Sequence, residues 1–316
     1  MSSVLDKRLL WITGKGGVGK STVAAALGLA GARRGRRTIV CEVAEQERLS
    51  RLFRHEGISP GDETHLSDGL WATTVDPRRA LAEWLRTQVG PLARALDASN
   101  AFQYFVAAAP GAREVVTMVK CWELTQQRRW DRRARAYDLV IVDAPASGHG
   151  VSMLRTPRTF ADIARVGPIH SQARRVRDFL ADRAATGYLA VALAEEMPVT
   201  ETLELDDRLS DQVGRRLEAV VVNALYPRRF SAEQLSRVRA AALADADGAA
   251  TAITGAARAA GAEYHRRRGQ QAQLQRLRVE ARRQGDASVV TLPYLFEPEL
   301  DLDDVERLAA DLDRKL

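Results

Sequence analysis

Short runs of apolar residues recur along the chain, separated by longer stretches in which apolar residues follow a helical spacing. A short, wholly apolar run is typical of a strand buried on both faces, and the helical spacing is typical of helices that cover a sheet. Strands that alternate with helices in this way favour a parallel sheet. The chain is therefore predicted to be a doubly wound α/β protein with a mostly parallel sheet, whose strands lie at 8–13, 37–43, 71–76, 137–143, 188–194, 217–222 and 288–292.

Two long segments depart from this alternation because they show helical spacing over a length that should otherwise contain a strand. Residues 77–135 are predicted as a helical insertion within the domain. Residues 231–285 are predicted as a second helical and basic segment before the last strand, with a break near Gly248 and Gly255. We expect residues 1–316 to form one domain around a single sheet.

A glycine-rich loop follows the first predicted strand and matches the pattern G-x-x-x-x-G-K-[ST] at every fixed position. Glycines let the main chain close around an anion, and the helix that starts near Gly19 directs its positive end toward that anion. Lys20 has the position that reaches the β- and γ-phosphates, and the Ser21 hydroxyl has the position that binds Mg²⁺. The sequence therefore predicts a nucleoside triphosphate site formed by Gly14, Lys15, Gly16, Gly17, Val18, Gly19, Lys20, Ser21 and Thr22.

An acidic residue completes the predicted site from a distant part of the chain. Residues 137–142 form an apolar run that ends at Asp143, so this carboxylate lies at the carboxyl end of a predicted strand. In a parallel sheet the same edge also holds Gly14. A carboxylate there can hold Mg²⁺ through water while a hydroxyl binds it directly, and we therefore predict Ser21 and Asp143 as the metal-binding residues.

Lys15 and the segment after Asp143 make the sequence similar to one family. A second lysine in the form K-G-G-x-G-K-[ST] is seen in the ArsA-type arsenical-pump ATPases, the tail-anchored-protein targeting ATPases and the MinD/ParA partitioning ATPases. The segment Asp143-Ala144-Pro145-Ala146-Ser147-Gly148-His149 resembles the D-T-A-P-[TS]-G-H signature of the first two branches, with its proline one place early. The chain thus resembles the ArsA-like ATPases, and most of all the paired ArsA-like ATPases of actinobacteria.

This resemblance implies a fold of the P-loop NTPase type, with ATP and Mg²⁺ as ligands, and a dimer. Lys15 would cross the dimer interface to the phosphates of the partner's nucleotide, and Glu201 would help to hold the dimer. The alternatives are that Lys15 is a solvated loop lysine and that Glu201 stabilises the first turn of a helix that begins near Thr200. The residues implied at the adenine base are Asn223, Pro293 and Tyr294.

The family pattern fails at one position that matters for hydrolysis. The aspartate that orients the attacking water in that family falls at Ala44 when Leu49 and Phe53 are aligned with the apolar positions after it. Glu42 and Glu45 are the available substitutes, and a solvated loop charge is an equally good interpretation of both. The candidate catalytic residues are Lys15, Lys20 and Glu45.

Composition sets bounds on the partners. A formal net charge of +6 favours acidic partners in general, but the arginine cluster at 263–283 lacks the interleaved aromatic residues of a nucleic-acid site. We therefore expect no nucleic-acid partner and at most a peripheral contact with a membrane.

Two cysteines are too few for a soft metal site, so Cys121 is expected to be a buried structural residue. Since no apolar run approaches the ~18 residues of a spanning helix, we expect a cytoplasmic protein.

Three functions are open on this basis. The first is a Mg²⁺-dependent ATPase that works as a nucleotide-gated dimer on an unknown client protein, either as a homodimer or as a heterodimer with a sibling ArsA-like subunit that keeps the aspartate. The second is an ATP-binding regulatory subunit with little hydrolysis of its own, because Ala44 cannot orient water. The third is a MinD/ParA-like partitioning ATPase, which the basic segment would serve.

Overall fold

The structure is a computed structural model that describes residues 3–43, 48–55, 57–89, 111–164, 167–244, 250–285 and 287–316. Its centre is an eight-stranded sheet in the order β3-β4-β2-β5-β1-β6-β7-β8, in which β3 is antiparallel to β4 and the other pairs are parallel. The strands are β1 (Leu9–Thr13), β2 (Thr38–Glu42), β3 (Thr64–Ser67), β4 (Leu70–Thr74), β5 (Leu139–Asp143), β6 (Thr186–Leu193), β7 (Ala219–Leu225) and β8 (Ser288–Pro293).

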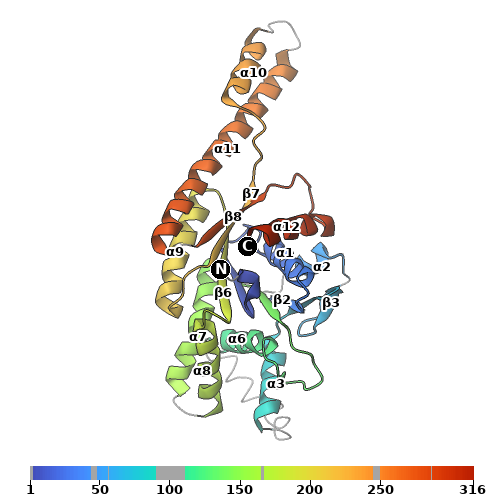
Figure 1. The fold of residues 1–316 in the computed structure, drawn as a ribbon, viewed down its shortest axis with the longest axis vertical. Helices are drawn as coiled ribbons and strands as arrows, with labels where there is room; N and C mark the ends of the chain where they lie inside the picture. Colours follow the sequence, from blue (N-terminus) through green and yellow to red (C-terminus); the bar gives the residue numbers. More distant parts are fainter. Residues whose placement is uncertain are drawn as a thin grey trace.

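Helices cover both faces of the sheet (Figure 1). One apolar cluster joins the sheet to α1, α2 and α12, and a second joins its other face to α6, α7, α8, α9 and α11. This arrangement confirms the predicted doubly wound α/β fold. The helices are α1 (Lys20–Arg33), α2 (Arg48–Leu52), α3 (Pro77–Val89), α6 (Ala112–Leu124), α7 (Ser147–Ala164), α8 (Pro168–Ala181), α9 (Glu196–Val213), α10 (Ala232–Ala244), α11 (Ala250–Gln284) and α12 (Leu302–Lys315), with a short 3₁₀ helix at Val4–Asp6.

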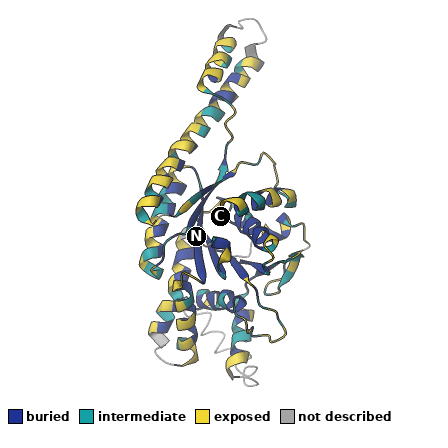
Figure 2. Cartoon of the chain, viewed as in Figure 1, coloured by how far each residue is buried: buried dark blue, intermediate teal, exposed yellow. Residues whose placement is uncertain are grey.

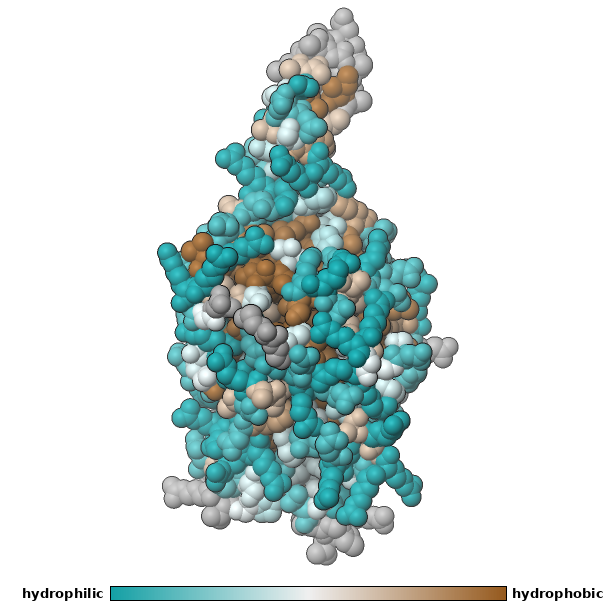
Figure 3. All heavy atoms as spheres, viewed as in Figure 1, coloured by the Kyte–Doolittle hydropathy of each residue, from teal (hydrophilic) through white to brown (hydrophobic). Residues whose placement is uncertain are grey.

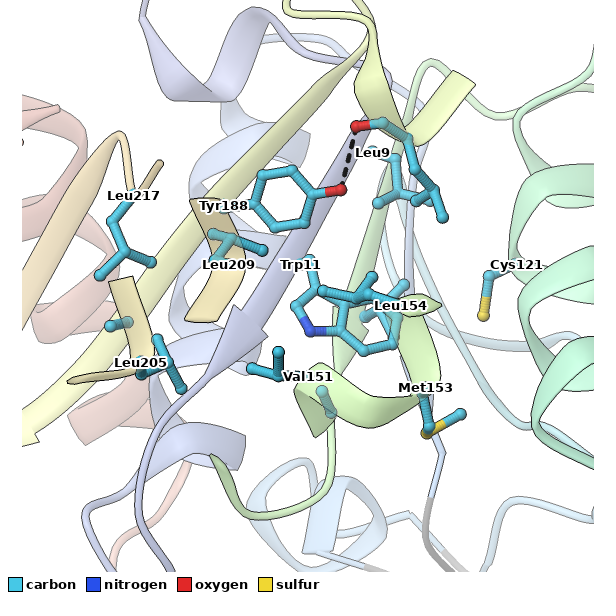
Figure 4. Packing of buried hydrophobic residues seen from close by; sticks show 14 of the residues in the cluster. Leu9, Trp11, Cys121, Val151, Met153, Leu154, Tyr188, Leu205, Leu209 and Leu217 are labelled. Carbon is cyan, nitrogen blue, oxygen red and sulfur yellow. Dashed lines mark hydrogen bonds between the residues drawn. The ribbon is translucent and has the colours of Figure 1, made fainter. Parts of the chain in front are cut away.

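The strands at the centre of the sheet are buried along their whole length and are mostly apolar, because helices cover both of their faces (Figure 2). Figure 4 shows Trp11 of β1 packed beside Val151 and Leu154 of α7. In the same cluster the Tyr188 hydroxyl of β6 donates to the carbonyl of Leu180 at 3.0 Å, so its polar end is satisfied inside the core. These buried central strands fix the position of the loops at their carboxyl ends.

Three local predictions were wrong, each for a physical reason. Residues 64–67 lie outside the predicted strands, but they form the antiparallel edge strand β3, which is too short and too polar to produce an apolar run. Within the segment expected to be helical, α6 ends at Leu124 and the chain then turns, because the Arg129 guanidinium pairs with Glu123 and Glu63. Gly255 lies inside α11 and does not break it.

Helices α10 and α11 pack against each other and project from the body as an arm, which we call the α10–α11 arm (Figure 1). The later part of α11 returns along α9 and the edge of the sheet. Helix α11 carries eight arginines and two glutamates, so its formal charge of +6 equals that of the whole chain. Hydrophilic residues accordingly cover much of the lower arm in the view of Figure 3.

The two cysteines come from distant parts of the chain and meet in the core. Cys41 of β2 and Cys121 of α6 are both fully buried, and burial, followed by the neighbouring Cys121 side chain, raises the pKa of the Cys41 thiol. The prediction that Cys121 is buried is therefore confirmed. Across the described ranges there is no cluster of three or more metal-ligating side chains. Within those same ranges, none of the helices combines the length and the apolar character needed to cross a membrane.

Candidate functional site

The glycine-rich loop joins β1 to α1, and two of its glycines have conformations that other residues rarely adopt. Gly14 has φ 142°, and a Cβ atom there would lie 2.2 Å from the carbonyl oxygen of Val191 in β6. Gly19 has φ 93° and is the N-cap of α1, where no side chain caps the helix. Because the first backbone N–H groups of a helix lack partners within it, this end of α1 is suited to an anion.

Lys20 stands in the first turn of α1 and is only 8 % exposed. Its ammonium donates to the carbonyl oxygen of Lys15 at 3.0 Å, which closes the loop on itself. Burial lowers the pKa of Lys20, and the nearby Asp143 carboxylate opposes that change. A desolvated ammonium at the open end of a helix is well placed to pair with the phosphates of a nucleotide.

The two predicted metal ligands are in contact. Ser21 Oγ donates to Asp143 Oδ2 at 2.5 Å, and Asp143 is the last residue of β5, beside Ile12 of β1. The other carboxylate oxygen, Asp143 Oδ1, is buried and has no hydrogen-bond partner in the described part of the chain. Burial raises the pKa of Asp143. A buried carboxylate oxygen without a partner beside a serine hydroxyl is a donor set that fits Mg²⁺.

Lys15 extends from the loop to helix α9, where its ammonium forms an ion pair with Glu201 at 2.5 Å. Both side chains are partly exposed, so the pair lies at the surface of the loop. The prediction that a helix begins near Thr200 was wrong, because α9 begins at Glu196 and the Thr200 hydroxyl bonds the Glu196 carbonyl inside the helix. Pro198 in the first turn permits this earlier start, since its missing N–H is not needed there.

Glu42 is not the solvated loop charge that was considered, because it is the last residue of β2 and 1 % exposed. Its Oε1 atom accepts from the backbone N–H groups of Arg48 and Leu49 at the start of α2. Its Oε2 atom is buried without a partner among the described residues, and burial raises the pKa of the carboxyl. The other substitute, Glu45, and the expected position of the aspartate, Ala44, lie outside the described residues.

Sequence reasoning missed Arg48, whose charge acts on the same site. After burial, which has the larger effect on both groups, its positive charge adds to the lowering of the Lys20 pKa and opposes the raising of the Asp143 pKa. The signature segment after Asp143 also differs from a simple loop, because Gly148 and His149 lie in the first turn of α7. His149 is exposed and lies 3.9 Å from Glu114 of α6, measured from Nε2 to Oε1.

The residues implied at the nucleotide base lie on β7 and β8. Asn223 lies inside β7 rather than just past it, and its Nδ2 atom donates to the Val18 carbonyl of the glycine-rich loop at 3.0 Å. Pro293 ends β8, and the following Tyr294 stacks on Tyr226 with ring centroids 4.6 Å apart. The structure thus brings Asn223 against the loop and places the two tyrosines just past the neighbouring strand ends.

Comparison with known proteins agrees with this geometry. Residues 7–167 match the model of the family described as anion-transporting ATPases. The ATPase BagA of Mycobacterium tuberculosis is 32 % identical over 237 residues, which cover 73 % of this chain and 68 % of that protein. A putative arsenical pump-driving ATPase of Halobacterium salinarum is 28 % identical over 72 % of this chain and 37 % of its own, and ATPase get3 of Aspergillus terreus is 28 % identical over 54 % of this chain and 50 % of its own. The chain belongs to the family of anion-transporting ATPases and is therefore an ATPase.

Proposed function

We propose that this ATPase binds ATP with Mg²⁺ at the loop between β1 and α1 and works as a nucleotide-gated dimer. The observation that carries the proposal is the arrangement of Lys20, Ser21 and Asp143, which meet at the open end of α1 although Asp143 comes from a strand 122 residues away in sequence. In a family of ATPases, this combination is the set of groups that a triphosphate and its cation require.

The residues of the chain account for binding and for charge stabilisation. Backbone N–H groups of the loop and the buried ammonium of Lys20 bind the β- and γ-phosphates, where negative charge develops on transfer of the γ-phosphoryl group to water. Ser21 and the unpaired Oδ1 side of Asp143 would hold Mg²⁺, which neutralises phosphate charge when bound. Because these groups lie close together without nucleotide, binding would require only local changes, in which Lys20 leaves the Lys15 carbonyl and the Ser21 hydroxyl turns from Asp143 to the cation.

The position of Lys15 is consistent with the proposed dimer. Its side chain is partly exposed and its ammonium pairs with Glu201, so without nucleotide its charge is engaged by helix α9. In a dimer formed across this edge of the sheet, the same ammonium would exchange Glu201 for the phosphates of the other subunit. The second subunit would be either another copy of the chain or a sibling subunit with the aspartate that Ala44 replaces.

The rival is an ATP-binding subunit with little turnover of its own, and the engagement of Glu42 favours it. One oxygen of Glu42 is occupied by the N-terminus of α2 and the other is buried, so this carboxylate is not free to orient water at the surface of the site. The chain is then a subunit with little turnover only if Glu45 does not orient the attacking water either.

Steady-state release of phosphate from ATP by the purified chain separates the two functions, with Lys20→Ala as the control for contaminating ATPases. Turnover that Lys20→Ala abolishes makes the chain an active ATPase by itself. Saturable ATP binding with no turnover above the Lys20→Ala background makes it the regulatory half of a pair. Light scattering with and without ATP measures whether the nucleotide drives dimer formation, and an unchanged mass would contradict the nucleotide-gated dimer.

A further inference from the structure

The chain bends sharply at the end of β7, one residue after Asn223. Ala224 has φ 57°, in the left-handed region, and the register of β7 against β8 shifts between Val222 and Leu225. A residue with a Cβ atom in this conformation costs about 1 kcal/mol or more, so the surrounding structure has to hold it there. The origin of that stabilisation is found on helix α11.

Gln270 of α11 holds both sides of the bend. Its Nε2 atom donates to the carbonyl oxygen of Ala224 at 3.0 Å, and its Oε1 atom accepts from the backbone N–H of Tyr226 at 2.9 Å. The side chain is 7 % exposed, and both polar atoms of its amide are satisfied by this one segment. Arg266, one turn earlier in α11, adds a third contact by donating to the Tyr226 hydroxyl at 2.8 Å.

The bend directly follows Asn223, whose side chain contacts the glycine-rich loop. Asn223 is the residue before Ala224, and its amide donates to Val18 at 3.0 Å while lying so close to Gly19 that a Cβ atom there would be 2.4 Å from Nδ2. The amide therefore supports the glycine-rich loop at the two residues that precede Lys20. A continuous set of contacts leads from Gln270 through the bend to this loop.

Packing around the bend is incomplete on one side, because a pocket of about 570 Å³ lies beside it. Its walls include Ala224, Tyr226, Tyr294 and Gln270 itself. A strand end next to open space can rearrange without a steric penalty from its neighbours. The two hydrogen bonds from Gln270 therefore restrain the bend on its open side, and the stacking of Tyr226 on Tyr294 and the backbone bond from Tyr294 to Leu225 add to this restraint.

We propose that Gln270 is a positioning residue for nucleotide binding, which joins the α10–α11 arm to the phosphate loop. The proposal rests on the proposed binding of ATP at this loop. Without Gln270 the bend relaxes, Asn223 leaves Val18, and the loop samples shapes that do not match the phosphates. Since coupling is reciprocal, bound nucleotide also restrains the part of α11 that contacts the bend. A partner that binds the arm and displaces this part of α11 would therefore change the affinity for nucleotide.

The first test compares Gln270→Ala with Gln275→Ala, which truncates an exposed glutamine on the same helix. Titration calorimetry with Mg²⁺ and ATP should give a dissociation constant about tenfold higher for Gln270→Ala, which corresponds to about 1.4 kcal/mol. The kcat value should change less than about twofold, because Gln270 does not touch the substrate. Gln275→Ala should bind as the unmodified chain does. A folded Gln270→Ala with unchanged affinity would overturn the proposal.

A second substitution separates positioning from loss of packing. Ala224→Gly removes the cost of the left-handed conformation, so the bend can persist without its restraint. When added to Gln270→Ala it should recover at least half of the lost free energy of ATP binding. No recovery, with a lowered melting temperature in both variants, would mean that Gln270 only fills space, and the proposal would fail.

Hydrogen exchange tests the proposal without nucleotide. Gln270→Ala should speed exchange of the loop amides between Gly16 and Lys20 in the free chain, and Gln275→Ala should not. If the unmodified chain bound no ATP while this exchange effect remained, the proposed function would fail and the coupling would stand. Unchanged exchange at the loop would remove the coupling even if ATP bound normally.

Discussion

The carboxyl edge of the sheet, where we propose that the nucleotide binds, is held in different ways at β1 and β5 and at β7. At β1 and β5 the site is built locally, since glycines give the loop its shape and the short side chains of Ser21 and Asp143 meet directly. At β7 the backbone is held from outside, by Gln270 on a helix 46 residues further along the chain. The contribution of the β1 and β5 part to nucleotide binding should be lost when its own residues change and should not depend on the arm. The contribution of the β7 part should change when the arm is altered.

The largest effect is expected at the locally built β1 and β5 part. Lys20→Ala removes the ammonium that we propose binds the phosphates, and it should lower kcat/KM for ATP by at least about 10²-fold. Phosphate release measures this, with Lys315→Ala on the terminal helix as the matched control. An equal loss in both variants would show that the assay reports general damage rather than a phosphate contact.

Asp143→Asn should lower Mg²⁺-dependent turnover by about 10²-fold and yet stabilise the chain without nucleotide by on the order of 1 kcal/mol. Burial raises the pKa of Asp143 in the folded chain above its unfolded value, so the ionised carboxylate costs stability. That cost is fully present above the folded pKa and disappears as the pH falls below the ordinary value of about 4.

Thermal unfolding near neutral pH and near pH 4 tests whether the ionised Asp143 carboxylate lowers the stability of the folded chain. The variant should unfold at a higher temperature than the unmodified chain at neutral pH, and the difference should shrink in acid. A variant that is less stable at neutral pH would mean that the bond from Ser21 outweighs the cost of burial.

A pair of isosteric changes compares the two candidate carboxylates. Glu45→Gln should lower kcat by about 10²-fold with little change in stability if Glu45 orients water, whereas Glu42→Gln should leave kcat within about threefold because Glu42 caps α2. Both kcat values come from the same phosphate assay. The reverse order would assign the role of orienting water to Glu42, whose Oε2 atom would then have to turn toward the site.

The smallest effect is expected at the surface ion pair. Glu201→Gln frees Lys15, and because both side chains are partly exposed the change in folding stability should be at most about 0.5 kcal/mol. The ATP concentration that drives dimer formation should fall a few-fold, since Lys15 no longer has to leave a partner. Light scattering against ATP concentration measures it, and Glu204→Gln, an exposed position on the same helix, is the control.

The difference between the two parts explains what could be predicted from the sequence. The positions of the parallel strands along the chain, the glycine-rich loop and the Ser21–Asp143 pair follow from local patterns. The structure confirms that the side chains of Ser21 and Asp143 are in contact. The bond from Gln270 to Ala224 leaves no such pattern, because a glutamine in a long polar helix looks the same whether it is buried or not. The edge strand β3 was missed for a related reason, since one exposed side leaves it no apolar run.

The start of α9 shows a further limit. Thr200 resembled an N-cap, but the preceding residues could already be helical, and tertiary packing of Val199 and Thr202 selected the earlier start. Such a choice is made by contacts with the sheet and not by the capping residues alone.

The charge on α11 also affects how the molecule behaves in solution. Because this helix carries a formal charge equal to that of the whole chain, the remainder is formally neutral, and the net positive charge of the protein is concentrated along one side. An approaching polyanion would therefore exert a torque that turns this helix toward it before any contact is made. A version of the chain without these arginines would lose mutual repulsion between copies near neutral pH and should precipitate at lower concentrations.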